Sequence, residues 1–359
     1  MSIRSLAVVL VGACLSVLAP GVRAAQSVDV YGAWHCGNDY CTWSTVRSVD
    51  EFDARNHWLI DRGNGRPSVN LVVLAFVHPL KLLDRTTDAG TLNGVPRGIT
   101  PEIVDYFKSR DVRVMLSIGG ITYTTAWNQA LAKNPTQLGL NAAALAEQLG
   151  VGIEIDYEEN KSPNLAGLEA FIRAYRSVNK YDPTGTNHAA RLTIDLAAGD
   201  RWLIALTRKA TADWLRDTSL EDVRLDYANA MVPARQPSMR DAIANWQEHV
   251  DGKPQYAPPI PPLAPAKFTG SVYLVGSKVI PECNRFATSL QSSTSTFVRN
   301  VVGKEASMTP GMLGYMFWAA ECSGTRNVCT TPPNSCEGGV GVGATTFDVP
   351  VPMPPLRQH

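Results

Sequence analysis

Three acidic residues, Glu154, Asp156 and Glu158, alternate with large apolar residues in the stretch from Gly150 to Glu159. In a β-strand, a period of two places all three carboxyl groups on one face. The intervening residues, two isoleucines and a tyrosine, predict that the opposite face is buried too, as in a parallel strand covered by helices. The simpler alternative is a surface strand with one charged face.

Carboxyl groups that converge inside a protein repel one another, so at least one of them is expected to hold a proton near neutral pH. A protonated carboxylic acid beside an ionised carboxylate is suited to acid catalysis on a glycosidic bond. The acidic stretch therefore predicts a catalytic site, provided that the rest of the chain can bury it.

Strand-like apolar segments alternate with helix-like segments along the chain. Thr100 and Pro101, for example, are typical of a helix start, as a cap residue followed by a proline in the first turn. We expect strands at 28–34, 69–76, 112–118, 150–159, 192–197, 227–232, 272–275 and 313–318, and helices near 50–60, 100–110, 135–149, 162–175, 204–215, 238–250 and 285–302.

Eight such repeats predict an α/β fold, a (β/α)8 TIM barrel without a large insertion between the seventh and eighth strands. An open doubly wound sheet is the alternative, but its glycine-rich phosphate fingerprint is missing. In a barrel, catalytic groups lie at the C-terminal ends of the strands. That position selects Ser117, the Gly119-Gly120 pair, Asp156, Glu158, Asp195, Met231, Tyr273 and Trp318. For each of these residues, the alternative is a purely structural role, in core packing, in a tight turn or as a buried, hydrogen-bonded hydroxyl group.

Composition bounds the kind of partner. The chain has 359 residues, 45% of them hydrophobic, and its 33 basic residues balance 33 acidic ones. This balance argues against nucleic acid and favours a neutral substrate. The six histidines are scattered without ligand spacing, so we expect no metal and no cofactor. We expect the protein to be a monomer.

The N-terminus is typical of an export signal. Arg4 precedes an apolar run from Leu6 to Leu18, and Val22-Arg23-Ala24 is a small-x-small cleavage site. We therefore expect a signal peptide at 1–24, a catalytic domain at 25–328, and a proline- and glycine-rich tail of little structure at 329–359. The mature protein would be secreted or periplasmic, with no membrane segment. Val11 to Cys14 faintly suggests a lipoprotein site, which Gly12 fits poorly.

Six cysteines remain after removal of the signal peptide, and an even number in an exported chain favours disulfide bonds. Cys36 and Cys41 would close a small loop. The spacing does not settle how the others pair: Cys283, Cys322, Cys329 and Cys336.

Together these segments resemble glycoside hydrolase family 18, the chitinases and their endo-β-N-acetylglucosaminidase relatives. Ser117–Gly120 resembles the S-x-G-G motif of the third strand, and Val151–Glu158 the D-G-x-D-x-D-x-E motif of the fourth. Leu192–Gly199 resembles the fifth strand, Met231 the methionine of the sixth, and Gly314–Trp318 the closing tryptophan strand. The likeness spans about residues 31–318 in the right order. No single motif is decisive, but the combination is specific.

The resemblance implies a role for each acid. Glu158 would protonate the leaving oxygen and then activate water, while the N-acetyl oxygen of the substrate attacks the anomeric carbon, with retention of configuration. Asp156 would orient the acetamido group and hydrogen-bond Glu158, and Glu154 would complete the catalytic set. Trp318 would form the floor beneath the sugar. The other expected substrate-binding residues are Tyr31, Trp34, Tyr273, Met231, Ser117 and Gly120.

Three positions depart from the family pattern. Val151 replaces the first acidic residue, Glu154 replaces an aspartate, and Pro233 stands where the family commonly has a tyrosine that holds the acetamido group. Tyr227 or Tyr273 could supply the missing hydroxyl. The loss of one such hydrogen bond predicts a slower enzyme, by about 10²- to 10³-fold.

The predicted function is endo-type, retaining hydrolysis of β-1,4-linked N-acetylglucosamine polymers such as chitin or chitooligosaccharides. The alternatives are an endo-β-N-acetylglucosaminidase that acts on N-glycans and a non-catalytic chitin-binding lectin on the same barrel. Such lectins typically lack the acid glutamate, so the presence of Glu158 favours an enzyme.

Overall fold

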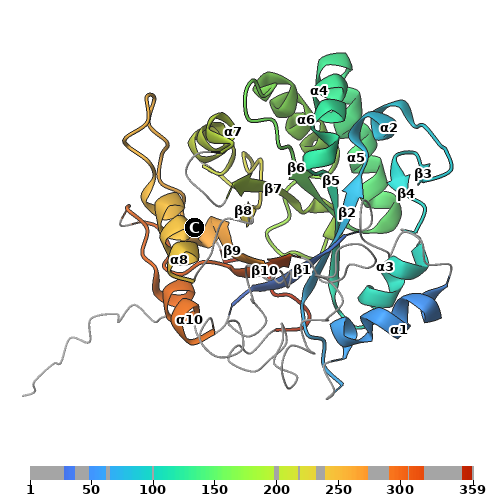
Figure 1. Ribbon diagram of the computed structural model, residues 1–359, viewed down its shortest axis with the longest axis horizontal. Coiled ribbons are helices and arrows are strands. Elements are labelled where there is room, and N and C mark those ends of the chain that lie inside the picture. Colours follow the sequence, from blue (N-terminus) through green and yellow to red (C-terminus); the bar gives the residue numbers. More distant parts are fainter. Residues whose placement is uncertain are drawn as a thin grey trace, which may run out of the picture.

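The centre of the molecule is a closed barrel of eight parallel strands (Figure 1). The computed structural model describes residues 28–36, 48–61, 65–98, 101–197, 202–216, 219–231, 239–273, 291–305, 307–318 and 350–357. Going round the barrel, the strands are β1 (Val30–Cys36), β2 (Leu71–Val77), β5 (Arg113–Gly119), β6 (Gly152–Asp156), β7 (Leu192–Ala197), β8 (Tyr227–Met231), β9 (Phe268–Tyr273) and β10 (Gly314–Trp318). Because β10 pairs with β1, the sheet has no open edge, and the predicted (β/α)8 barrel is confirmed.

Helices cover the outside of the barrel (Figure 1). They are α1 (Val49–Ile60), α2 (Pro79–Asp84), α3 (Pro101–Lys108), α4 (Thr124–Lys133), α5 (Pro135–Leu149), α6 (Leu165–Val178), α7 (Ile204–Lys209), α8 (Met239–Asp251) and α10 (Gln291–Asn300). A π-helical turn, η4 (Ala210–Trp214), extends α7, and short 3-10 turns are η2 (Ile121–Tyr123), η3 (His188–Ala190) and η5 (Pro265–Lys267). A small hairpin of β3 (Thr91–Leu92) and β4 (Val95–Pro96) lies outside the barrel. Among the described helices, none is long and apolar enough to cross a membrane.

Strand β9 and helix α2 differ from the sequence prediction for physical reasons, and helix α4 was not predicted either. Strand β9 begins at Phe268 instead of Val272, because small polar residues, Thr269 and Ser271, are buried in it and interrupt the apolar run. Helix α2 was not predicted because it is short. It depends on local capping instead, in which the His78 side chain accepts a hydrogen bond from the Lys81 amide.

Alternation along the strands separates two environments. Ile153 and Ile155 of β6 belong to the core between barrel and helices, whereas Glu154 lies inside the barrel. Apolar residues such as Leu71 and Met316 fill the interior near the N-terminal ends of the strands. Towards the C-terminal ends the interior becomes polar. Both faces of β6 are therefore buried, as its sequence predicts.

The C-terminal segment corrects one expectation. We expected little structure after residue 329, yet residues 350–357 dock at the N-terminal end of the barrel. Met353 is buried in the apolar interior cluster, and Arg357 Nε donates a hydrogen bond to Asp29 Oδ2 at 2.7 Å. The side-chain Nδ2 of Asn70 donates a hydrogen bond to the Pro350 carbonyl oxygen at 3.0 Å. The segment therefore closes the barrel at the end opposite the acidic residues.

Several expectations fall outside the described residues. They are the signal peptide, the cysteines apart from the backbone of Cys36, Pro233, and the side chains of Tyr273 and Trp318.

Candidate active site

Strand β6 delivers the acidic residues to the C-terminal end of the barrel. Glu154 is paired in register with Ser117 of β5 and Thr193 of β7, and Asp156 with Gly119. Glu158 follows just beyond the strand. The exposed fractions are 0% for Glu154, 4% for Asp156 and 8% for Glu158, so exposure increases towards the mouth of the barrel. The acidic residues therefore form a line from the barrel centre outwards.

Glu154 is held from opposite sides of the barrel. Trp34 Nε1 of β1 donates a hydrogen bond to its Oε1 at 2.8 Å, and Asn229 Nδ2 of β8 donates to its Oε2 at 2.6 Å. Thr269 of β9 donates to Asn229 Oδ1 at 2.7 Å, which fixes the orientation of that amide. Burial raises the pKa of Glu154, and these hydrogen bonds oppose the rise.

Asp156 and Glu158 form a hydrogen-bonded pair of carboxyl groups. Burial, followed by the charges of Glu158 and Glu154, raises the pKa of Asp156 well above its ordinary value. Burial raises the pKa of Glu158 to about 7, although the Asp156 hydrogen bond and one from the Ile121 backbone amide lower it. One member of the pair therefore holds a proton near neutral pH, which a general acid requires.

The Gly119-Gly120 turn builds the wall beside this pair. Gly119 has a φ of +122°, and a Cβ there would lie 1.9 Å from the Asp156 carbonyl oxygen. The Gly120 amide donates to that same carbonyl at 3.0 Å, and Ile121 comes next in the chain. Glycine is therefore needed for β5 to approach β6 closely and to bring the Ile121 amide to Glu158.

Trp127 of α4 contacts the C-terminal ends of the same two strands, β5 and β6. This residue was not identified from the sequence. Its buried Nε1 lies 3.1 Å from both the Ile118 and Asp156 carbonyl oxygens. Asn229 was missed as well, although a signal existed, because it precedes Met231 by two residues and so shares the inward face of its strand.

A fourth buried carboxyl group joins the cluster. Asp195 of β7 is 2% exposed and hydrogen-bonded to Glu154, with Asn229 beside it on β8. In the described part of the chain, none of the four carboxyl groups forms an ion pair with a lysine, arginine or histidine. The four side chains are Glu154, Asp156, Glu158 and Asp195, and we call them the acidic cluster.

The other predicted residues divide between the cluster and the surrounding core. Trp34 binds Glu154 directly, and Ser117 is buried beside Glu154, although its hydroxyl forms no hydrogen bond of good geometry with the described residues. Tyr31 does not line a cleft, which corrects our expectation. It lies on the outer face of β1, with its ring 4.9 Å from that of Phe317. Met231 lies at the C-terminal end of β8, on the same face as Asn229, where it is partly buried and packs against residues of the larger apolar cluster.

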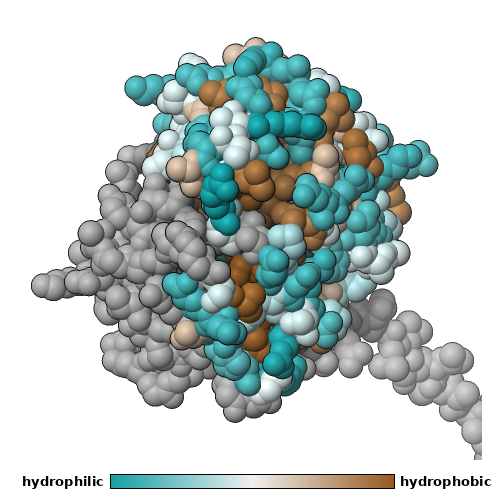
Figure 2. Space-filling view, turned by 90° about the vertical axis from the view of Figure 1, so that its right-hand side faces the viewer, coloured by the Kyte–Doolittle hydropathy of each residue, from teal (hydrophilic) through white to brown (hydrophobic). Residues whose placement is uncertain are grey.

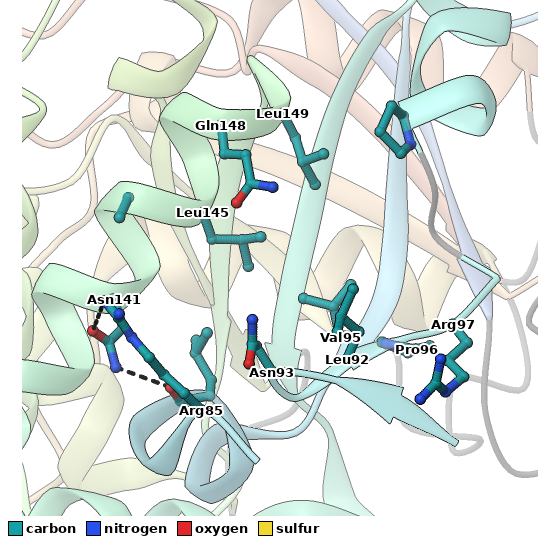
Figure 3. A pocket seen from close by; sticks show the side chains of 13 residues that line it. Arg85, Leu92, Asn93, Val95, Pro96, Arg97, Asn141, Leu145, Gln148 and Leu149 are labelled. Carbon is teal, nitrogen blue, oxygen red and sulfur yellow. Dashed lines mark hydrogen bonds between the residues drawn. The ribbon is translucent and has the colours of Figure 1, made fainter. Parts of the chain in front are cut away.

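A separate pocket of about 350 Å3 lies outside the barrel, between α5 and the β3–β4 hairpin (Figure 3). Figure 2 shows that side of the molecule, where hydrophobic residues gather in a hollow among hydrophilic ones. Arg85, Arg97 and Asn141 contribute polar groups to the pocket, but no carboxyl group lines it. It has no part in the acid chemistry of the cluster.

The fold and the site define a parallel (β/α)8 barrel that gathers buried, partly protonated carboxyl groups at its catalytic end. Among the described side chains, no three histidine, cysteine, aspartate or glutamate residues are arranged to hold a metal ion.

Comparison with known proteins gives remote likenesses to solved structures. No protein-family model matches the chain, and no curated protein matches it. The chain is similar to a family 18 chitinase from Pseudoalteromonas aurantia, with 12% identity and a TM-score of 0.49, over 80% of this chain and 93% of that one. It is also similar to chitinases from Rhizomucor miehei (14%, TM-score 0.47, 85% and 98% covered) and Aspergillus fumigatus (14%, TM-score 0.47, 80% and 90% covered).

Proposed function

We propose that the protein is a glycoside hydrolase of the family 18 kind, which cleaves β-1,4-linked N-acetylglucosamine polymers with retention of configuration. The observation that carries this proposal is the hydrogen-bonded pair of Asp156 and Glu158 at the C-terminal end of the barrel. The motifs on five strands, in family order, support it independently.

The contact between the two carboxyl groups bears on the mechanism. Glycosidases with two catalytic carboxyl groups place them on either side of the scissile bond, roughly 5–5.5 Å apart for retention and roughly 6.5–9.5 Å for inversion. Asp156 and Glu158 touch each other, so no sugar ring fits between them. Asp156 is therefore a poor candidate for the nucleophile, and the acetamido oxygen of the substrate supplies that role.

Glu158 then acts as the acid and afterwards as the base. Its raised pKa, about 7, leaves a large protonated fraction at neutral pH, and that proton goes to the leaving oxygen. Asp156, whose pKa is also raised, holds the acetamido group in position for attack. Secretion and endo-type cleavage are further parts of this proposal, and they rest on the sequence.

The test is hydrolysis of chitohexaose by the wild type and by Glu158→Gln, with the product anomers followed by proton NMR. We expect the β-anomer first, and a loss of about 10²-fold or more in the variant. Cellohexaose is the matched control, because it has the same linkage but no acetamido group, and it should remain intact.

Other outcomes would redirect the assignment. Cleavage of cellohexaose at a similar rate would overturn the substrate-assisted mechanism. Binding of chitohexaose without cleavage would favour the lectin alternative, and cleavage confined to an N-glycan would favour the endoglycosidase.

A further inference from the structure

The buried carboxyl group of Asp195 is not used by the mechanism above. It reaches the interior from β7, one strand beyond β6, and it meets Glu154 there. The family motif carried over from the sequence assigns it no role. A buried carboxyl group in direct contact with another is costly unless a proton lies between them.

The hydrogen bonds around Glu154 decide where that proton lies. Each carboxyl oxygen of Glu154 already accepts a bond from an N–H group, one from Trp34 and one from Asn229. An indole N–H can only donate. The Asn229 amide is also fixed as the donor, because its oxygen accepts from Thr269. Glu154 therefore has the hydrogen-bond surroundings of a carboxylate anion. The proton between Glu154 and Asp195 then belongs to Asp195.

Among the described residues, no positive charge next to Asp195 favours its ionised form. Glu154 and Asp156 face it from β6, and the neutral Asn229 amide faces it from β8. His249 of α8 hydrogen-bonds the Ala197 carbonyl at 2.7 Å, and burial lowers its pKa to about 3, so it is neutral. Burial and the two neighbouring carboxylates raise the pKa of Asp195 well above its ordinary value, although a hydrogen bond from Asn229 opposes the rise.

We propose that Asp195 is a positioning residue, which donates a hydrogen bond from its protonated carboxyl group to Glu154 and thereby holds Glu154 as the anion of the acidic cluster. The catalytic consequence rests on the proposed function. The charge of Glu154 helps to keep the proton on Asp156, and Asp156 bonds Glu158. Asp195 therefore acts on the reaction through two other carboxyl groups, without touching the substrate.

Two substitutions separate this role from simple packing. Asp195→Asn keeps the shape and an N–H donor but cannot ionise, and an amide is a weaker donor than a carboxylic acid. We expect kcat to fall about three- to ten-fold, with KM and both limbs of the pH profile unchanged. Asp195→Ala removes the donor, so the pKa of Glu154 rises. The acidic limb of kcat/KM should then move to higher pH by about one unit.

Thr193→Val is the matched control. Thr193 is buried on the same strand, two residues earlier, and is paired in register with Glu154, but its hydroxyl has no hydrogen-bond partner among the described residues. Thr193→Val should shift neither the acidic nor the alkaline limb of the pH profile. If Asp195→Asn moves the alkaline limb down by about one unit, a negative charge has been removed and Asp195 was ionised, which overturns the proposal. Equal losses of kcat in both Asp195 variants, without a shift of either limb of the pH profile, would show that Asp195 only packs. That result also overturns the proposal.

A measurement without substrate keeps this inference separate from the proposed function. With carboxyl-13C aspartate, the NMR resonance that is missing in Asp195→Asn identifies Asp195 in the wild type. It should keep the chemical shift of a protonated acid from about pH 4 to neutral pH, above the ordinary aspartate pKa of about 3.9. A carboxylate shift over that range overturns the proposal. A wild type that hydrolyses nothing overturns the proposed function, while this NMR result decides the state of Asp195 alone.

Discussion

The indole N–H of Trp34, on the first strand of the barrel, donates a hydrogen bond to Glu154, on the fourth strand, at 2.8 Å. The bond spans 120 residues of sequence, and both side chains are almost fully buried. It joins the strand that opens the barrel to the strand that carries the acids. The acidic cluster therefore depends on contacts between strands that are not neighbours in the barrel.

Replacement of Trp34 with phenylalanine tests this bond. Trp34→Phe removes a donor to a buried carboxylate, so we expect the free energy of unfolding to fall by about 1–3 kcal/mol beyond the packing loss. The pKa of Glu154 should rise further above its ordinary value, because this bond lowers it. Urea denaturation and the acidic limb of kcat/KM measure the two effects.

Trp246→Phe is the control for that substitution. Trp246 is also fully buried, but its indole nitrogen has no hydrogen-bond partner among the described residues. Trp246→Phe should lose only the part of the free energy of unfolding that comes from packing. A similar loss of stability in both variants, with no shift of the acidic limb in Trp34→Phe, would contradict the importance of the Glu154 bond.

The raised pKa of Glu158 predicts a pH dependence of stability with a definite sign. The folded-state pKa, about 7, lies above the value of 4.5 expected for the unfolded chain. The unfolded chain therefore loses its proton first as the pH rises, and the free energy of unfolding falls between these two values by up to about 3 kcal/mol. The free energy of unfolding of Glu158→Gln should change less with pH over this range. A wild type and variant with parallel stability curves from pH 5 to about pH 8 would refute the raised pKa.

The same proton sets the alkaline limit of activity. Because Glu158 must be protonated to act as an acid, kcat/KM should fall as the pH rises through about 7. An initial-rate profile with chitohexaose measures this limit. Activity that stays constant up to about pH 9 would exclude Glu158 as the acid with this pKa.

Sequence reasoning found the acidic strand because alternation is a local property. A period of two with acids on one face and isoleucines on the other requires no knowledge of the partners. It could not find Trp127 or the role of Asp195, because each depends on contacts between different elements, which a pattern within one segment does not reveal. It also misplaced Tyr31. In β1 both faces are apolar, so the pattern does not reveal that Trp34 points inwards and Tyr31 outwards.

The Gly119 turn gives a further test of how the site is built. Gly119→Ala forces a side chain into left-handed backbone and places its Cβ against the Asp156 carbonyl. We expect a loss of about 3–5 kcal/mol in stability, together with a loss of activity as β5 moves away from β6. Gly65→Ala is the control, since Gly65 has a φ of +74° with no atom within 4 Å, and it should cost about 1 kcal/mol. Equal costs would mean that backbone strain alone governs Gly119.

The docked C-terminal segment predicts that stability and catalysis can be separated. Deletion of residues 350–359 removes Met353 from the apolar interior cluster and Arg357 from Asp29, so the N-terminal end of the barrel becomes exposed. We expect the free energy of unfolding to fall by about 3 kcal/mol or more. Because the acidic cluster lies at the opposite end, kcat/KM of the folded fraction at low temperature should stay near the wild-type value. Met353→Leu, which conserves volume, should cost less than about 1.5 kcal/mol. A truncated chain as stable as the wild type would show that the segment does not close the barrel in solution.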